Sequence, residues 1–181
     1  RNITERKQME QALQESEEDL RAVFEGTSVG IALVGFDAKT LSINPAFERM
    51  LGYNLEEFRQ LEDNLRYLHP DDAMIDAKLY IEMLKGKREH YTVDKRYLRK
   101  DGAVIWGRQN LSVVRDYEGK PKYFIAMIED ITERKKMEDA LRESEERFRR
   151  LVDHAPDIIF RWSAGKGLEY VSPIVTAITG Y

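Results

Sequence analysis

An internal repeat constrains the fold of this chain more than any other feature. Residues 3–21 read ITERKQMEQALQESEEDLR, and residues 131–149 read ITERKKMEDALRESEERFR. The offset of 128 residues (131 − 3) also superposes Gly52-Tyr53 on Gly180-Tyr181 without a gap. Because a fixed period marks a structural unit, we expect one complete unit, a polar helix followed by a globular body. We expect the remaining residues to be the first part of a second unit, cut from a tandem array.

Both copies of the repeated stretch predict a helix with an apolar seam. Apolar residues recur at spacings of four and three, and Glu, Arg and Lys fill most other positions. The seam positions are Met9, Leu13, Ser16, Leu20 and Val23 in the first copy, and Met137, Leu141, Ser144, Phe148 and Leu151 in the second. Two interpretations stay open: each helix lies on its own domain, or each forms a parallel, coiled-coil-like seam with a second copy of the chain. The serines weaken the seam locally.

Composition excludes several functional classes. The chain has no cysteine, which excludes disulfides, thiolate metal sites and cysteine nucleophiles. Its net charge is −4 with both signs interspersed, so no basic surface for nucleic acid is expected. No apolar run approaches the ~20 residues that a membrane span needs. We expect a cytoplasmic location, with any membrane anchor of the parent protein outside this segment.

A period of two in the hydrophobic pattern begins at residue 29 and predicts strands. The first hairpin is expected from Val29–Phe36 and Leu41–Ile43. Asn44 and Pro45 suit the first positions of a helix, and Gly52 suits the position just after its end. The sequence therefore predicts two strands followed by a short helix.

Helices and then three further strands are expected in the rest of the body. Short helical pieces are predicted in residues 54–68, and a longer helix at about 72–85 that ends at Gly86. The strands are expected at Tyr91–Leu98, Ala103–Val114 and Lys122–Glu129. The pair Asp101-Gly102 is a strong hairpin signal. The expected fold is α+β, a five-stranded antiparallel sheet with short helices on one face, flanked by the coiled-coil-like helices.

Several motifs in this order resemble the PAS domain with its C-terminal PAC motif. They are Asn44-Pro45-Ala46-Phe47, His69-Pro70-Asp71-Asp72, Arg99-Lys100-Asp101-Gly102 and Asp130-Ile131-Thr132-Glu133-Arg134-Lys135. The resemblance covers residues 16–135 and restarts at 144. It implies a sensory and dimerisation module without catalytic residues of its own. The implied parent is a multi-PAS signalling protein, most often a sensor histidine kinase and next most often a diguanylate cyclase.

The resemblance also implies domain boundaries and partners. Four segments are expected: an exit helix of a preceding PAS unit (1–15), a complete PAS/PAC domain (16–132), a signalling linker helix (133–147) and the start of a second PAS domain (148–181). Neighbouring PAS and kinase domains of the parent chain, a homodimer through the helical linkers and a small-molecule ligand are the implied partners. A ligand-free PAS unit that only relays or dimerises stays open as the alternative.

Strand alternation and the photoreceptor branch of the family predict the same cavity wall between sheet and helices. Val93, Lys95 and Tyr97 are expected to face inward from one strand, Gly107, Gln109 and Leu111 from the next, and Phe124, Ala126 and Ile128 from the last. Tyr97, Gly107, Gln109, Leu111, Ala126 and Ile128 are the predicted ligand-binding residues, with Tyr97 and Gln109 orienting a polar group. The alternative is a filled core, packed by Phe47, Met50, Met74 and Tyr97.

The same resemblance argues against the best-known cofactors. Leu65 stands where flavin photoreceptors have their reactive cysteine, and Tyr97, Gly107 and Ile128 replace flavin-binding amides. No histidine lies in residues 72–85 to bind haem iron. We therefore expect neither a cysteine–flavin adduct nor haem, and the ligand stays unknown. His69, Asp71 and Asp72 are expected to cap a helix, and no metal site or catalytic residue is predicted.

The signal is expected to leave through Asp130, Ile131 and Thr132, where the last strand becomes the exit helix. In the family this Asp often pairs with a basic residue of the Asp-Gly hairpin, for which Arg99 and Lys100 are the candidates. Thr132 is predicted to cap the exit helix.

Two further expectations concern packing. Trp106 is expected on the outer face of the sheet, covered by the preceding helix around Leu20, Val23 and Phe24. The second copy, with a strand at 158–162, has no counterpart of the last three strands. We therefore expect it to be disordered, truncated or completed by contacts from elsewhere.

Overall fold

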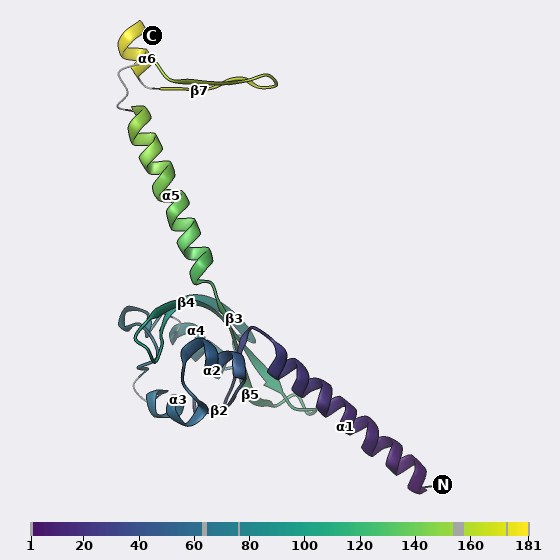
Figure 1. Ribbon diagram of the computed structural model, residues 1–181. Coiled ribbons are helices and arrows are strands. Elements are labelled where there is room, and N and C mark those ends of the chain that lie inside the picture. Colours follow the sequence, from purple (N-terminus) through teal and green to yellow (C-terminus); the bar gives the residue numbers. More distant parts are fainter. Residues whose placement is uncertain (1, 63–64, 76, 154–157, 173, 181) are drawn as a thin grey trace. The chain divides into compact units, whose positions relative to one another are not determined.

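The computed structural model describes residues 2–62, 65–75, 77–153, 158–172 and 174–180. These residues divide into two compact units, 1–132 and 133–181. The first unit contains the helix α1 (Asn2–Gly26) and the globular body (Figure 1). Within the described residues, no helix is long and apolar enough to cross a membrane.

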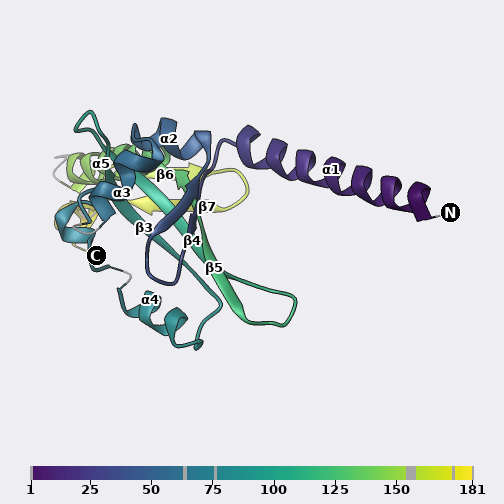
Figure 2. The same cartoon turned by 90° about the horizontal axis from the view of Figure 1, so that it is seen from below.

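The body is built on a five-stranded antiparallel sheet with the order β2-β1-β5-β4-β3 (Figures 1 and 2). Its strands are β1 (Gly30–Val34), β2 (Thr40–Ile43), β3 (His90–Leu98), β4 (Val104–Arg115) and β5 (Pro121–Asp130). The expected α+β architecture, with two strands, several short helices and three further strands along the chain, is confirmed. Each strand end agrees with the sequence prediction to within two residues, because alternation and turn residues specify these strands locally.

Helices on one face of the sheet close the core. They are α2 (Pro45–Leu51), α3 (Leu55–Glu62), the 3₁₀ turn η1 (Pro70–Asp72) and α4 (Ala77–Leu84). Phe47 and Leu51 of α2, Phe58 of α3 and Met83 of α4 are buried in one cluster with the inward residues of the sheet. The helices α2, α3 and α4 therefore each direct apolar side chains into the core.

Asn44 joins three elements of the first unit. Its side-chain oxygen accepts hydrogen bonds from the backbone N–H of Phe47 (2.9 Å), as the predicted cap of α2, and of Ile31 (2.8 Å) in β1. Its amide group donates to the carbonyls of Phe24, in α1, and Val29, each at 2.9 Å. The side chain is fully buried, so four backbone groups depend on it.

The prediction of a long helix at about 72–85 is wrong for its first turn. The motif His69-Pro70-Asp71-Asp72 closes only the η1 turn, and α4 starts at Ala77. The reason is tertiary: the backbone of residues 67–69 pairs with the edge of β3, through Leu98 N–H to the Tyr67 carbonyl and His69 N–H to the Arg96 carbonyl. Asp72 is thereby held against β3.

Trp106 lies on the outer sheet face, but the preceding helix does not cover it. Leu20 and Val23 are 68% and 69% exposed. The neighbour of the indole is Arg96, directly opposite on β3, with its guanidinium carbon 5.6 Å from the ring centroid. A cation–π contact thus occupies the place expected for α1.

The second unit begins with the helix α5 (Thr132–Asp153), which starts in the last residue of the first unit. The described residues after it form a hairpin of β6 (Phe160–Ser163) and β7 (Gly167–Val171), followed by α6 (Ile174–Thr179). These residues have regular structure, so the expectation of disorder is wrong for them. The strand expected at 158–162 corresponds to β6, which begins two residues later than expected, at Phe160; residues 154–157 lie outside the described residues.

Candidate functional site

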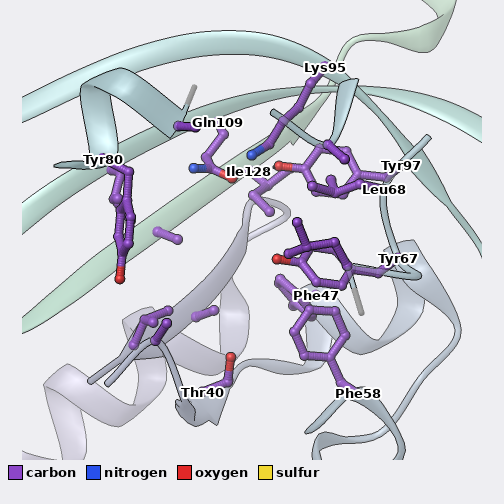
Figure 3. Close-up of a pocket in the computed structure, with 18 of the residues that line it drawn as sticks. Thr40, Phe47, Phe58, Tyr67, Leu68, Tyr80, Lys95, Tyr97, Gln109 and Ile128 are labelled. Carbon is purple, nitrogen blue, oxygen red and sulfur yellow. Dashed lines mark hydrogen bonds between the residues drawn. The ribbon is translucent and has the colours of Figure 1, made fainter. Parts of the chain in front are cut away.

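A cavity of about 260 Å³ lies between the sheet and the helices of the first unit. Its walls come from every layer of the body: the strands, α2, α3, the segment that contains η1, and α4 (Figure 3). Phe47, Met74 and Tyr97 line this space and do not fill it. The volume exceeds the ~150 Å³ of an engineered cavity that binds benzene, so it has room for a small organic molecule.

Most residues predicted from strand alternation line the cavity. Tyr97, Gln109, Leu111, Ala126 and Ile128 do so, together with Lys95. The alternation works here because antiparallel register puts Leu111 opposite Ala126, and Gln109 opposite Ile128, on one face. Their role in ligand binding stays a prediction.

Gly107 has a different place from the other predicted residues. A Cβ atom added to it would lie 2.5 Å from Cε2 of Tyr97 and 2.9 Å from Cγ2 of Ile128. The absence of a side chain at Gly107 therefore makes room for the Tyr97 ring, which then forms the cavity wall. Gly107 shapes the site without lining it.

Phe124 and Val93 also face inward without lining the cavity. Phe124 is fully buried, with its ring centroid 4.5 Å from that of Phe36 and 5.7 Å from that of Tyr80. Val93 is partly buried against the core cluster. These side chains support the wall from behind.

Polar groups are few in the cavity and mostly come from the sheet. The Tyr97 hydroxyl donates a hydrogen bond to the Gln109 side-chain oxygen at 2.8 Å. The amide nitrogen of Gln109 has no hydrogen-bond partner among the described residues. Lys95 is only 4% exposed, and its Nζ lies 5.8 Å from the centroid of the Tyr97 ring. Figure 3 shows the polar ends of these three side chains gathered at one end of the cavity.

The cavity also has lining residues that sequence reasoning missed. Among them are Thr40 of β2, Phe58 of α3, Tyr67 and Leu68 of the segment before η1, and Tyr80 of α4. Tyr80 is notable because its hydroxyl is buried and has no hydrogen-bond partner in the described residues. Burial raises the pKa of Tyr80 above its ordinary value of 10.0, so the hydroxyl is a donor at neutral pH. The spacing of Ala77 and Tyr80 on α4 could have indicated this inward face.

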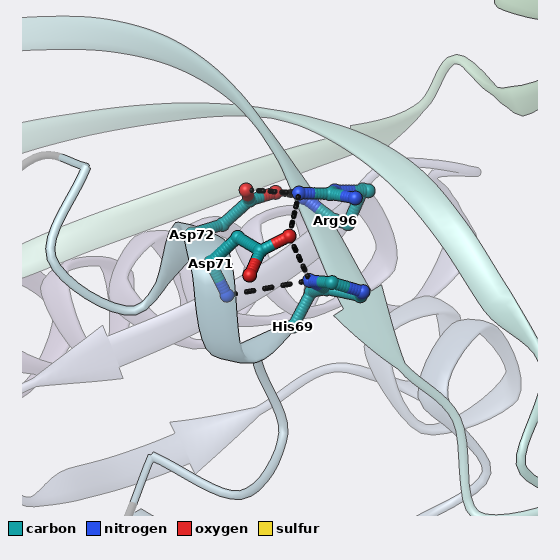
Figure 4. A network of polar contacts seen from close by, with 4 residues as sticks. All are labelled: His69, Asp71, Asp72 and Arg96. Carbon is teal, nitrogen blue, oxygen red and sulfur yellow. Dashed lines mark hydrogen bonds and ion pairs between the residues drawn. The ribbon is translucent and has the colours of Figure 1, made fainter.

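A polar network holds η1 to the edge strand β3 (Figure 4). Arg96 donates to both oxygens of Asp72, at 2.9 Å from Nε to Oδ2 and 2.7 Å from NH2 to Oδ1, and its backbone N–H adds a third bond of 2.7 Å. These hydrogen bonds lower the pKa of Asp72 from 3.8 to about 2. His69 caps η1 as predicted, through its Nδ1, 3.3 Å from the N–H of Asp71. Asp72 is an ion-pair partner of the sheet rather than a cap.

The start of α5 is joined to the sheet by two hydrogen bonds with the backbone of Trp106. The N–H of Ile131 donates to the Trp106 carbonyl at 2.8 Å, and the Trp106 N–H donates to the Thr132 hydroxyl at 2.9 Å. Ile131 is 2% exposed. These bonds extend the β4–β5 pairing to the first residue of the helix, so β4 and the start of α5 are directly joined.

Two details of this junction differ from the sequence prediction. The Thr132 hydroxyl does not cap α5; the Asp130 carboxylate does, accepting from the Thr132 N–H at 2.9 Å. The expected ion pair of Asp130 with Arg99 or Lys100 is not formed. Lys100 instead lies 2.6 Å from Glu57 of α3, because its backbone N–H bonds the Leu51 carbonyl and directs this hairpin toward the helices. Arg99 lies 3.5 Å from Asp101.

Comparison with known proteins defines the class. Residues 40–128 match the sequence family described as the PAS fold. The structure superposes on a sensory box histidine kinase/response regulator from Burkholderia thailandensis E264 with a TM-score of 0.55 and 28% identity, covering 74% of this chain and 98% of that one. It also superposes on an RNA-binding light-oxygen-voltage receptor with a TM-score of 0.58 and 26% identity, over 72% of this chain and 37% of that one. The chain contains a PAS domain.

Curated relatives of this chain are much longer proteins. The chain is 36% identical over 151 residues to the probable diguanylate cyclase DgcE of Escherichia coli, which covers 83% of this chain and 14% of that protein. It is 31% identical over 131 residues to the sensor histidine kinase TmoS of Ectopseudomonas mendocina, which covers 72% of this chain and 13% of that protein. The chain thus spans about a seventh of the length of these relatives and is homologous to that part of each.

Proposed function

We propose that the first unit is the small-molecule sensor of a longer signal-transduction protein and that α5 carries its output. The observation that carries this proposal is the cavity of about 260 Å³ whose wall, β4, also holds the first residues of α5. A ligand that contacts Gln109 on β4 acts on the same strand as Trp106, three residues away. Binding and output thereby share one rigid element.

The proposed effector is a histidine kinase domain elsewhere in the parent chain, with a diguanylate cyclase as the second candidate. Both kinds of protein are among the relatives of this chain. The residues described here supply the sensory part, and the enzymatic activity belongs to the effector. The family resemblance and the helical exit support this assignment.

The seam of α1 and α5 supports a homodimer. Its apolar residues are exposed by 61–75%: Met9, Leu13, Leu20, Val23, Met137, Leu141, Phe148 and Leu151. Neither helix therefore buries these side chains against its own domain. Heptad spacing of such residues favours pairing of the same helices from two chains, and paired helices pass rotation or tilt from one domain to the next. Replacing Leu13 and Leu141 by Glu should convert a dimer into a monomer in light-scattering measurements.

Native mass spectrometry of the purified chain tests the sensory function. A bound mass that is lost on denaturation, and that the double variant Gln109→Leu/Tyr97→Phe fails to retain, is the expected result. If the protein retains no ligand and no metabolite mixture restores one, the unit is a ligand-free spacer that dimerises and relays. Thr92, exposed on β3 and outside the cavity, provides the matched control Thr92→Val, which should retain the ligand.

A further inference from the structure

The Tyr80 hydroxyl in the cavity wall is buried and has no hydrogen-bond partner among the described residues. Its ring packs against the fully buried Phe124, with 5.7 Å between the ring centroids. Figure 3 shows the hydroxyl pointing away from Lys95 and Gln109. Buried polar groups in proteins are nearly always hydrogen-bonded. The acceptor for this hydroxyl therefore has to come from whatever occupies the cavity.

The electrostatic surroundings of this hydroxyl favour an uncharged acceptor. Burial raises the pKa of Tyr80, and the negative charge of Asp37 raises it further, so the hydroxyl keeps its proton and donates. The same negative charge would repel a carboxylate placed at this end of the cavity. Asp37 itself takes part in the turn between β1 and β2, where its carboxylate accepts from the N–H of Lys39 at 3.1 Å. A carbonyl or ether oxygen therefore suits this position better than an anion.

The rest of the cavity makes no provision for a charged ligand. Of the described residues that line it, Lys95 alone is charged. This lysine already interacts within the protein, and its Nζ lies 5.8 Å from the centroid of the Tyr97 ring. Its positive charge opposes a cation, and an anion would lose its hydration among apolar and aromatic side chains without gaining an uncommitted partner. The cavity thus favours a neutral ligand.

The walls of the cavity favour a ring. Phe47, Phe58, Tyr67 and Tyr97 all line the space, and aromatic side chains pack well against an aromatic guest in edge or offset contact. Since about 150 Å³ holds benzene, a cavity of about 260 Å³ holds one ring with a short substituent.

We propose that the ligand is a neutral compound of one aromatic ring whose carbonyl or ether oxygen accepts a hydrogen bond from the Tyr80 hydroxyl. The ring occupies the apolar part of the cavity, and the oxygen gives the site its selectivity, because it supplies the acceptor that the described residues do not. This inference rests on the proposed sensory function and narrows it to one ligand class.

Calorimetric titration of the whole chain with three probes of the same shape tests the ligand class. The probes are acetophenone, α-methylstyrene, in which a methylene group replaces the carbonyl oxygen, and benzoate, which adds a charge. Acetophenone should bind more tightly than benzoate, because the cavity favours a neutral guest. Benzoate that binds as tightly as acetophenone overturns the neutral class and leaves the sensor intact.

Tyr80→Phe tests the assigned contact, because it removes the hydroxyl and keeps the ring that packs on Phe124. It should lower the affinity for acetophenone relative to that for α-methylstyrene about threefold or more, the worth of a typical hydrogen bond. The control Tyr117→Phe, at a tyrosine that is 96% exposed, should leave this ratio unchanged. The variant removes an unpaired buried group, so it is expected to fold as stably as the wild type.

An affinity ratio that stays the same in Tyr80→Phe overturns the assigned contact. If none of the three probes binds, the ligand class is overturned as well. A retained mass of another kind in native mass spectrometry would then show that the sensory function survives, whereas no retained mass would remove both proposals.

Discussion

The two repeats use the same local interactions and bury very different amounts of their side chains. In the first unit, Ile31 exchanges hydrogen bonds with Asn44, backbone to backbone at 2.9 Å and backbone to side chain at 2.8 Å. In the second, Ile159 makes the same two bonds with Ser172, at 2.8 and 2.9 Å. Ser172 stands 128 residues after Asn44 (172 − 44) and is likewise fully buried. The hairpin-to-helix junction is therefore specified by the repeated sequence itself.

The short helices α2 and α6 also end in the same way. Gly52 follows α2 with a φ of 81°, and Gly180 follows α6 with a φ of 75°. Each donates its N–H to the carbonyl four residues earlier, at 2.7 and 2.9 Å. Both helices thus end with a left-handed residue, the conformation for which glycine is the default.

Burial of the two hairpins is where the repeats differ. In the first unit β1 pairs with β5 as well as with β2, and Ala32 is 3% exposed. In the second unit the described strands form a sheet of β6 and β7 alone, and Phe160 and Trp162 are 66% and 63% exposed. The comparison teaches that local capping can build the junction, but that the three later strands are needed to bury it.

The largest effect is expected from Asn44→Ala. It removes the partners of four backbone groups, two N–H and two carbonyls, and should lower the free energy of unfolding of the first unit by about 3 kcal/mol or more. Ser172→Ala removes one such bond in the second unit and should cost about 1 kcal/mol. Because the chain has two tryptophans, urea unfolding in a Trp162→Phe background reports the first unit through Trp106, and a Trp106→Phe background reports the second.

The variant Asn44→Ser tests this prediction more sharply, because serine is the residue at the equivalent position of the second repeat, Ser172. Serine retains the acceptor and loses the two amide donors, so its effect should lie between those of the wild type and Asn44→Ala. If Asn44→Ser and Asn44→Ala destabilise the unit equally, the hydrogen bonds that Asn44 donates to Phe24 and Val29 account for the loss. The two junctions would then differ in energy although their geometry is similar.

A second, smaller effect concerns pH, and it should affect the first unit alone. The pKa of Asp72 is about 2 in the folded unit and 3.8 ordinarily, held down by hydrogen bonds from Arg96. A lowered carboxyl pKa adds stability that is present above the unfolded pKa and lost as the pH falls through the folded one. About 2 kcal/mol should therefore disappear between roughly pH 4 and pH 2.

Asp72→Asn checks this pH effect. The variant should be less stable than the wild type at pH 7 by about 2–3 kcal/mol, because Arg96 loses its charged partner, and the difference should shrink as the pH approaches 2. Asp139→Asn, in an exposed ion pair on α5 with 67% of the side chain accessible, is the control and should change stability little. A constant difference at all pH values would show that the Asp72 charge is not what stabilises the unit.

The smallest effect separates the two glycine caps. Alanine at either position is strained by the positive φ, by about 1 kcal/mol. A Cβ at Gly52 would also lie 3.2 Å from Cβ of Lys100, whereas Gly180 has no atom within 4 Å of that position. Gly52→Ala should therefore destabilise its unit somewhat more than Gly180→Ala, in the same urea measurements. Equal losses of stability would mean that the hairpin around Lys100 moves away from the added Cβ without destabilising the unit.

The local part of this structure could be predicted from the sequence for physical reasons. Caps and turns depend on one residue and its immediate neighbours, so Asn44, Gly52 and the Asp101-Gly102 turn indicated their structures directly. Strand alternation has a period of two and needs no knowledge of the partner, which is why Tyr97, Gln109 and Ile128 were correctly expected on one face. The repeat itself predicted that the second copy starts like the first.

Only the tertiary structure decided the contacts between distant segments. Asp72 and Arg96 are 24 residues apart, and Trp106 and Thr132 are 26 apart; no local pattern distinguishes Asp72 as a partner of β3 from Asp72 as a helix cap. The same holds for Tyr80, which reaches the cavity only because α4 packs over the sheet, and for Lys100, which the hairpin directs to Glu57. Such contacts depend on where whole elements pack, and that is set by the shared burial of the core rather than by any one stretch of sequence.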